Sequence, residues 1–329
     1  MGFKHFRLGT IVTILLSLGI AQKGLCWNSV SRSLRVDDLK RDYLLHVPGS
    51  YPQQNSSALL FVFHGGGGDA LQAEKHTKFS QLADEKGFIV VYPNAIDKQW
   101  NDGRGVRKFR SQKEKIDDVG FVLAIIDTLS AEYNINRSGI FIAGVSNGAI
   151  FCNRLAAEAS ETFAAMAAVI GSMAKPVARK FHPRKSIPVL IMNGTQDPLV
   201  PFKGGGVGFL GFRGQVIGVE ACVRKWVRHN KCARRPVISE LPDIDPDDGT
   251  RVTRRVYSSR VGSGEVVYYK IENGGHNWPG GQKYLSEKIV GKLCKDIDAT
   301  KIIWEFFNAH ITHPSLRRAR QPFGAKHKR

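Results

Sequence analysis

Short apolar runs of four to six residues recur along this chain, separated by longer segments in which apolar residues return at helical spacing. A short apolar run bounded by turn residues is typical of a buried strand, and an apolar residue every three or four positions is typical of an amphipathic helix. The pattern predicts strands at 42–47, 58–63, 88–92, 140–143, 166–170, 187–192 and 266–271. It predicts helices at 70–86, 119–133, 147–158 and 297–310. Strands that alternate with helices favour an α/β fold with a mostly parallel sheet covered on both faces.

A G-x-S-x-G pattern at 144–148 lies between a predicted strand and a predicted helix. A serine on such a sharp turn is held exposed at the edge of the sheet, so Ser146 is a candidate nucleophile. The backbone N–H of Asn147 then becomes a candidate donor to a developing oxyanion. A chance match is the alternative, because the chain has 34 glycines. The strand before the motif and the helix after it favour the catalytic interpretation.

A second glycine-rich loop, at 65–68, follows the predicted strand 58–63 and His64. Bare backbone N–H groups after a strand can face a ligand, and Gly65 or Gly66 is expected to supply the other oxyanion donor. A flexible turn or a phosphate-binding loop is the alternative, although no Walker lysine follows. His64 is expected to orient this loop.

A serine hydroxyl needs a base, and imidazole needs a carboxylate to fix its tautomer. His276 and Asp197 each follow a predicted strand, and the order Ser146, Asp197, His276 is that of α/β-hydrolases. Other histidines and aspartates lack this context; they are His46, His182, His229, His310, Asp243, Asp245, Asp247 and Asp248. Two tryptophans in loops after strands, Trp100 and Trp278, are candidates for the substrate-binding wall, with packing roles as the alternative.

The first 21 residues carry two basic residues followed by an apolar run, which predicts a signal peptide and a secreted or periplasmic protein. We expect a single catalytic domain over 22–313 and a basic, disordered tail over 314–329. The formal net charge of +19 suggests attraction to anionic surfaces. No stable membrane insertion is expected after cleavage of the signal.

Five cysteines are present, and an exported protein can oxidise them. Cys222 and Cys232 flank a predicted helical stretch and a turn, and they are the best candidates for a disulfide. No cysteine spacing suggests zinc, so no metal site is predicted.

Several motifs in this order resemble the secreted polyhydroxybutyrate depolymerase / feruloyl and acetylxylan esterase family. The resemblance covers roughly residues 40 to 310 and rests on 61–69 (FVFHGGGGD), 92–94 (YPN) with 100–104 (WNDGR), 117–121 (DDVGF), 144–149 (GVSNGA), 193–201 (NGTQDPLVP) and 275–280 (GHNWPG). It implies an α/β-hydrolase fold and hydrolysis of carboxylic esters without a cofactor. It also implies that Ser146 is the nucleophile, Asp197 the acid and His276 the base.

The predicted function is a secreted serine esterase acting on polyhydroxybutyrate-type polyesters or on feruloyl or acetyl esters of polysaccharide. A polymeric ester is one candidate substrate, to which Phe209, Phe212 and Trp100 could present exposed aromatic rings. A serine peptidase of the same fold is the nearest alternative. A non-catalytic protein that binds anionic surfaces is another, but no nucleic acid is expected as a partner because no nucleic-acid motif is present.

Overall fold

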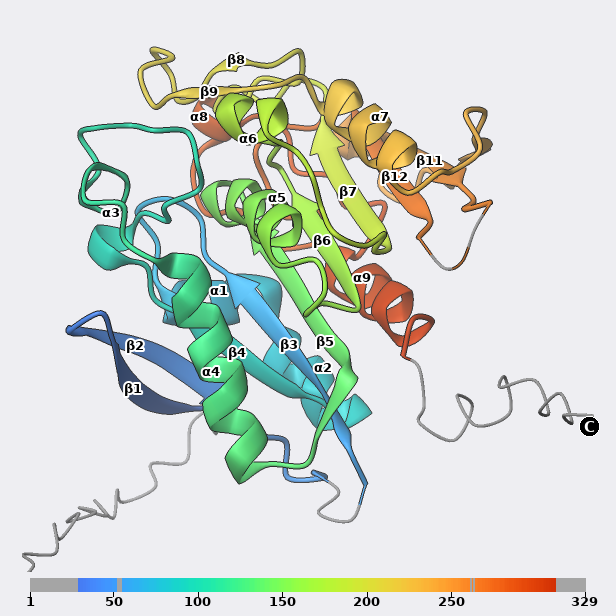
Figure 1. Cartoon of the computed structure of the whole chain (residues 1–329). Coiled ribbons are helices and arrows are strands. Elements are labelled where there is room, and N and C mark those ends of the chain that lie inside the picture. Colours follow the sequence, from blue (N-terminus) through green and yellow to red (C-terminus); the bar gives the residue numbers. More distant parts are fainter. Residues whose placement is uncertain (1–28, 52–54, 261, 263, 312–329) are drawn as a thin grey trace, which may run out of the picture.

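The computed structural model describes residues 29–51, 55–260, 262 and 264–311. Its main strands are β1 (Val30–Val36), β2 (Leu39–His46), β3 (Ser57–Phe63), β4 (Ile89–Pro93), β5 (Ile135–Val145), β6 (Ala165–Val169), β7 (Val189–Gly194), β10 (Val237–Glu240), β11 (Arg251–Tyr257) and β12 (Val266–Glu272). They form one ten-stranded sheet in the order β1-β2-β4-β3-β5-β6-β7-β12-β11-β10 (Figure 1). All seven strands that the apolar runs predict are present.

The centre of the sheet, from β4 to β12 in that order, is parallel. Two antiparallel strands extend it on each side, β2 and β1 beyond β4, and β11 and β10 beyond β12. Because the central strands are parallel, their carboxyl ends meet at one edge, where α/β proteins bind their ligands. A small two-stranded ribbon of β8 (Gly205–Gly206) and β9 (Gln215–Val216) lies above that edge, as Figure 1 shows.

Helices cover both faces of the sheet. Their bounds are α1 (Ala70–Thr77), α2 (Phe79–Lys86), α3 (Arg110–Lys113), α4 (Asp118–Glu132), α5 (Asn147–Glu158), α6 (Lys175–Arg179), α7 (Val219–His229), α8 (Glu287–Val290) and α9 (Ala299–Asn308), with 3₁₀ turns η1 (Ile96–Lys98) and η2 (Pro246–Asp248). The helix predicted at 70–86 is two helices, because Lys78 has a left-handed backbone (φ 55°, ψ 24°) that ends α1 and starts α2.

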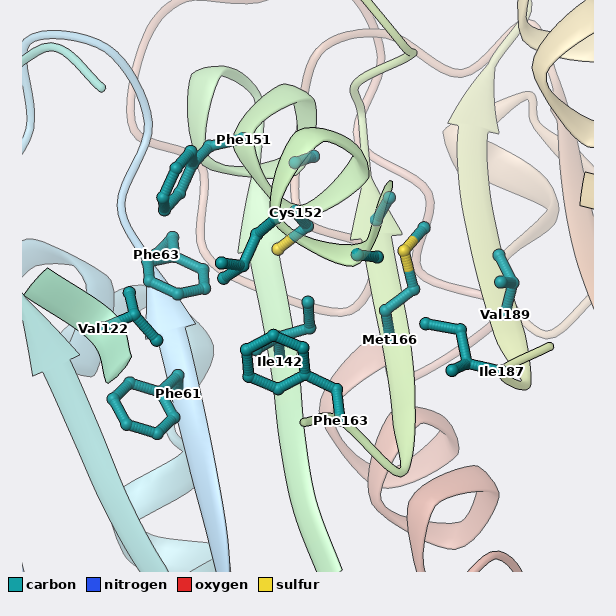
Figure 2. Close-up of a cluster of buried hydrophobic side chains, with 14 of the residues drawn as sticks. Phe61, Phe63, Val122, Ile142, Phe151, Cys152, Phe163, Met166, Ile187 and Val189 are labelled. Carbon is teal, nitrogen blue, oxygen red and sulfur yellow. The ribbon is translucent and has the colours of Figure 1, made fainter. Parts of the chain in front are cut away.

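The core is divided by the sheet into two apolar layers. Side chains alternate along a strand, so Phe61 and Phe63 of β3 pack on the side of α4, α5 and α7, whereas Leu60 and Val62 pack on the side of α1, α2 and α9. Figure 2 shows the first layer, in which the two phenylalanines lie beside Ile142 of β5 and beneath Phe151 of α5. Continuous burial of β3 on both faces explains why its sequence reads as an unbroken apolar run.

The predicted signal peptide (1–21) and basic tail (314–329) lie outside the described residues. Within the described part of the chain, no helix combines the length and apolarity needed to cross a bilayer.

Candidate active site

Ser146 lies at the junction where β5 ends and α5 begins. Its backbone is in an unusual conformation (φ 56°, ψ −116°) that few non-glycine residues adopt. Its N–H donates to the carbonyl of Val169 on the neighbouring strand over 3.0 Å, which fixes the turn. The Ser146 hydroxyl makes no capping bond to α5, so it is available to other partners. The strand, turn and helix are the context that the G-x-S-x-G pattern requires.

Two glycines make this turn possible because backbone crosses backbone there. A Cβ atom on Gly148 would lie 2.3 Å from the carbonyl oxygen of Phe63, and one on Gly144 would lie 2.5 Å from the carbonyl carbon of Gly148. Neither position has room for a side chain. The glycines of the pattern are therefore explained by packing between β3, β5 and α5.

His276 joins Ser146 and Asp197 through its two ring nitrogens. Its Nε2 lies 2.8 Å from the Ser146 Oγ, and its Nδ1 lies 2.7 Å from the Asp197 Oδ2. An ionised carboxylate only accepts hydrogen bonds, so Nδ1 carries the proton and Nε2 is free to accept the serine proton. The three residues follow β5, β7 and β12, all at the same edge of the sheet.

Asp197 is held by backbone donors that leave one oxygen for His276. Its Oδ1 accepts from the N–H groups of Leu199 and Val200, each over 2.8 Å. The carboxylate is buried, as is the imidazole of His276. The backbone carbonyl of His276 accepts a hydrogen bond from the Tyr284 hydroxyl over 3.1 Å. Burial and the charge of Asp197 raise the pKa of Tyr284 to about 12, so this phenol stays protonated and can donate.

The glycine loop after β3 passes directly beside the serine. A Cβ atom on Gly65 would lie 3.4 Å from the Cβ of Ser146. The Gly65 carbonyl accepts from the His64 Nδ1 over 2.7 Å and from the Gly68 N–H over 3.0 Å. In a trans peptide the N–H points opposite to the carbonyl, so these two bonds also orient the Gly66 N–H.

His64 is neutral in this position. The Ala95 N–H donates to its Nε2 over 3.1 Å, so the ring proton is on Nδ1, where it bonds to Gly65. Burial lowers the pKa of His64 to about 4. His64 therefore positions the loop, as the sequence predicts, and its pairing leaves it no free nitrogen to act as a base.

Asn147 supplies the first N–H of α5, which has no acceptor within the helix. Its side chain is fixed by two neighbours: its Oδ1 accepts from the Trp100 N–H over 2.9 Å, and its Nδ2 donates to Asp102. Asp102 also pairs with Arg104 over 2.7 Å, and the Arg104 Nη1 donates to the carbonyl of Arg213 over 2.6 Å. Asp102 and Arg104 belong to the WNDGR segment, yet the sequence gives them no individual role.

A cavity of about 600 Å³ opens over these groups. Ser146, His276, the glycine loop and Trp278 are among the residues that line it. The segment between β8 and β9 forms part of its rim and carries three strongly exposed apolar side chains, Phe209, Leu210 and Phe212.

Trp100 does not form the substrate-binding wall that its position suggests. Its side chain is fully buried, stacked on Phe151 with ring centroids 5.0 Å apart and edge-on to Phe63. Its Nε1 donates to the carbonyl of His64 over 3.0 Å. Trp100 is a packing residue beneath the glycine loop, and its loop neighbours Gln99 and Arg104 line the cavity in its place.

The predicted Cys222–Cys232 disulfide is absent, and that prediction is wrong. Cys222 lies in the first turn of α7 with its thiol 3.4 Å from the Asn153 side chain, whereas Cys232 follows the helix and donates to the Gly264 carbonyl over 3.2 Å. A helix rises about 1.5 Å per residue, so α7 keeps the two residues too far apart for a bond that needs Cα atoms within about 7 Å. Burial raises the pKa of Cys222 to about 12 and that of Cys232 to about 11.

One group of residues in the described chain could in principle hold a metal, Asp248, Cys294 and Asp296. Its carboxylates already accept hydrogen bonds from backbone N–H groups, Asp248 from Thr250 and Lys295, and Asp296 from Ile244 and Asp245. Burial raises the pKa of the Cys294 thiol, which opposes thiolate ligation. The hydrogen bonds of Asp248 and Asp296 therefore have a structural role: they hold the segment 244–250 against the segment 295–296.

Comparison with known proteins finds similarity to esterases. Residues 42–186 match the family described as Esterase PHB depolymerase. The chain is 27% identical to the "Putative esterase NocK" of Nocardia uniformis subsp. tsuyamanensis over 288 residues, which cover 84% of this chain and 82% of the relative. It is 24% identical to "Feruloyl esterase D" of Neurospora crassa, covering 94% of this chain and 99% of the relative.

Among solved structures, an acetyl xylan esterase from Aspergillus awamori superposes with a TM-score of 0.57 at 12% identity, covering 85% of this chain and 99% of that chain. At that identity the likeness concerns the fold, which is that of an α/β-hydrolase, as the sequence predicts.

Proposed function

We propose that this chain, whose residues 42–186 match the Esterase PHB depolymerase family and whose relatives include esterases, cleaves carboxylic esters through an acyl-enzyme formed on Ser146. The observation that carries the proposal is the pair of hydrogen bonds from His276 to Ser146 and to Asp197. A serine is activated by this arrangement because imidazole can take its proton and a fixed carboxylate stabilises the imidazolium.

The proposed reaction assigns a residue to each step. His276 takes the proton of Ser146 as the oxygen attacks the ester carbonyl, and returns it to the departing alcohol. The oxyanion is held by backbone N–H groups of Asn147 and of Gly65 or Gly66. One such donor lowers the barrier by roughly 3 kcal/mol. Water then enters and loses a proton to His276 as it attacks the acyl carbonyl; the bond to Ser146 breaks, His276 returns the proton to the Ser146 oxygen, and the acid leaves.

The substrate class that fits the cavity is an ester with a sizeable apolar or aromatic portion. Phe209 and Phe212 are 66% and 75% exposed at the rim, and Trp278 lines the interior. Polyhydroxyalkanoate-type and feruloyl esters carry such a portion, and the relatives named above include a feruloyl esterase. Acetyl esters of polysaccharide lack it and are kept as candidates on the sequence resemblance alone. We further propose that the protein is exported, on the strength of its leader-like residues 1–21.

A substrate panel tests the proposal on the mature protein: hydroxybutyrate oligomers, methyl ferulate, acetylated xylan and a short p-nitrophenyl ester, beside a set of peptides. We expect turnover of at least one ester and none of the peptides. Ser146→Ala should remain folded by circular dichroism and lose turnover on every substrate. Cleavage of peptides in preference to esters would instead assign a peptidase of this fold.

The role of the aromatic rim is tested separately. Phe209→Ala/Phe212→Ala should reduce hydrolysis and adsorption of a polymeric ester while sparing the p-nitrophenyl ester. Leu71→Ala is a suitable control because Leu71 is also exposed but is not among the residues that line the cavity. Equal loss on polymer and soluble ester would reject the rim as a polymer contact.

A further inference from the structure

A second cavity, of about 590 Å³, lies between α7 and the strands β11 and β12. None of its lining residues also lines the catalytic cavity. The carboxyl end of β12 leads to His276, but Tyr268, which lines the second cavity, comes early in that strand. The two cavities are therefore separate features of the molecule.

The sequence builds this cavity from two regular patterns. Along α7, positions 220, 223, 224, 227 and 228 recur at helical spacing and form one face of the helix. Along β11, Arg255 and Tyr257 are two residues apart and share one face of the sheet, and Tyr268 of β12 pairs directly opposite Arg255. Both α7 and the strands β11 and β12 thus contribute polar side chains to the lining of the second cavity.

The charge of this lining is strongly positive. Four arginines, Arg224, Arg228, Arg234 and Arg255, face a single acidic residue, Glu220. Glu220 lies 3.4 Å from Arg255 and 3.7 Å from Arg224. Arg228 and Arg234 have no acidic partner within the described part of the chain.

Two buried polar atoms of the lining residues also lack a partner. The hydroxyl of Tyr268, a fully buried side chain, and the Nε of Arg255 make no hydrogen bond to any described residue. Buried donors are normally paired in folded proteins. Burial raises the pKa of Tyr268, so its hydroxyl keeps its proton and can donate. Both unpaired groups are donors, which suits an acceptor-rich ligand.

We propose that this cavity is a binding site for an oxyanion group, that is, a phosphate, sulfate or carboxylate, carried by a ligand other than the ester under attack. Guanidinium groups match the geometry of such oxygens with paired N–H donors. A neutral ligand would leave the positive charges unbalanced, and a cation would be repelled. The apolar floor formed by Val223 and Val227 leaves room for a carbon portion attached to the anion.

The test is calorimetric titration of the full mature protein with inorganic phosphate, sulfate and glucuronate, each at constant ionic strength. Arg224→Gln/Arg228→Gln removes two exposed charges of the site. Arg137→Gln/Arg184→Gln removes two exposed arginines elsewhere, each paired with one acidic residue, and is the matched control. Arg255→Lys keeps the charge but loses the planar fork.

We expect saturable binding of at least one probe, weakened about tenfold or more in Arg224→Gln/Arg228→Gln and in Arg255→Lys, and unchanged within about twofold in the control. The probe that binds best identifies the source of the oxyanion. Hydrolysis of the p-nitrophenyl ester should be unchanged in these variants, so this test is independent of the esterase proposal. Absence of saturation by all three probes, or equal weakening in the control, would overturn the site.

Discussion

Asp197 shows how a single residue can decide the chemistry. Both its oxygens are used, one by the backbone N–H groups of Leu199 and Val200 and the other by the Nδ1 of His276. An asparagine in its place keeps the shape but offers an amide where the carboxylate stood. The imidazole would then favour the tautomer with its proton on Nε2, which cannot accept from serine.

We therefore expect Asp197→Asn to lower kcat on a p-nitrophenyl ester by roughly 10³- to 10⁴-fold. Asp127→Asn, at an exposed aspartate paired with Arg137, should leave kcat unchanged. Retention of more than a tenth of the activity in Asp197→Asn would show that the carboxylate does not orient the base.

His64 gives a prediction on the pH dependence of stability. Its pKa is about 4 in the folded protein, below its ordinary value of 6.5. The unfolded chain thus binds the proton more tightly, and stability falls as the pH drops from about 6.5 to about 4. The full difference is worth roughly 3 kcal/mol.

Urea unfolding between pH 7.5 and pH 4 measures this slope, and His64→Asn should flatten it. Asparagine can still donate to the Gly65 carbonyl but does not titrate in this range. If the wild type and the variant lost stability in parallel over this range, other groups would be responsible.

At the scale of elements, the loop that carries Asp102 is hydrogen-bonded both to the start of α5 and to the segment between β8 and β9. Asp102 bonds to Asn147 and to Arg104, and Arg104 bonds to the Arg213 carbonyl. Both charged side chains are almost fully buried. A buried charge left without its partner is destabilising by about 3–5 kcal/mol, whereas exposed pairs contribute about 1 kcal/mol or less.

Accordingly, Asp102→Asn should lower the free energy of unfolding by about 3 kcal/mol or more, measured in urea. Glu114→Gln, which breaks the exposed pair with Arg110, should change it by less than about 1 kcal/mol and serves as control. Similar small changes in the two variants would mean that the network around Asn147 is not a rigid support.

The rigidity of α7 gives another prediction. Cys222 and Cys232 are both free thiols held in different surroundings. Alkylation in denaturant without reductant, followed by peptide mass spectrometry, should label both residues completely. A linked peptide pair carrying the two residues would contradict the structure of this region.

At the scale of the whole molecule, the elements that can be predicted from the sequence are those whose burial requires apolar residues. The central strands are covered on both faces, so they appear as apolar runs, and the residues after them gather at one edge. The apolar pattern does not predict the edge strands β1 and β10, nor β11 beside β10, because their residues are largely exposed or half-buried. Each is held in the sheet by antiparallel pairing with a strand next to it in sequence, β1 with β2, β10 with β11 and β11 with β12, and not by burial of both its faces.

The same difference between local pattern and tertiary packing explains which site residues could be predicted. Ser146, Asp197 and His276 could be placed because each follows a recognisable strand, whereas Trp100 and the cysteines depend on how a loop and a helix pack. Asp118 illustrates the limit: it stands beside the capping residue Asp117, yet it is buried in an ion pair with Arg41 over 2.6 Å. A partner 77 residues away in sequence leaves no local signal.

The most direct test of the central claim is to identify the residue that reacts with a fluorophosphonate probe. A nucleophilic serine attacks such a probe only when a base removes its proton. We predict one covalent adduct per chain, mapped by mass spectrometry to Ser146 and abolished in His276→Ala. No adduct on the folded protein, or an adduct on another residue, would contradict the account.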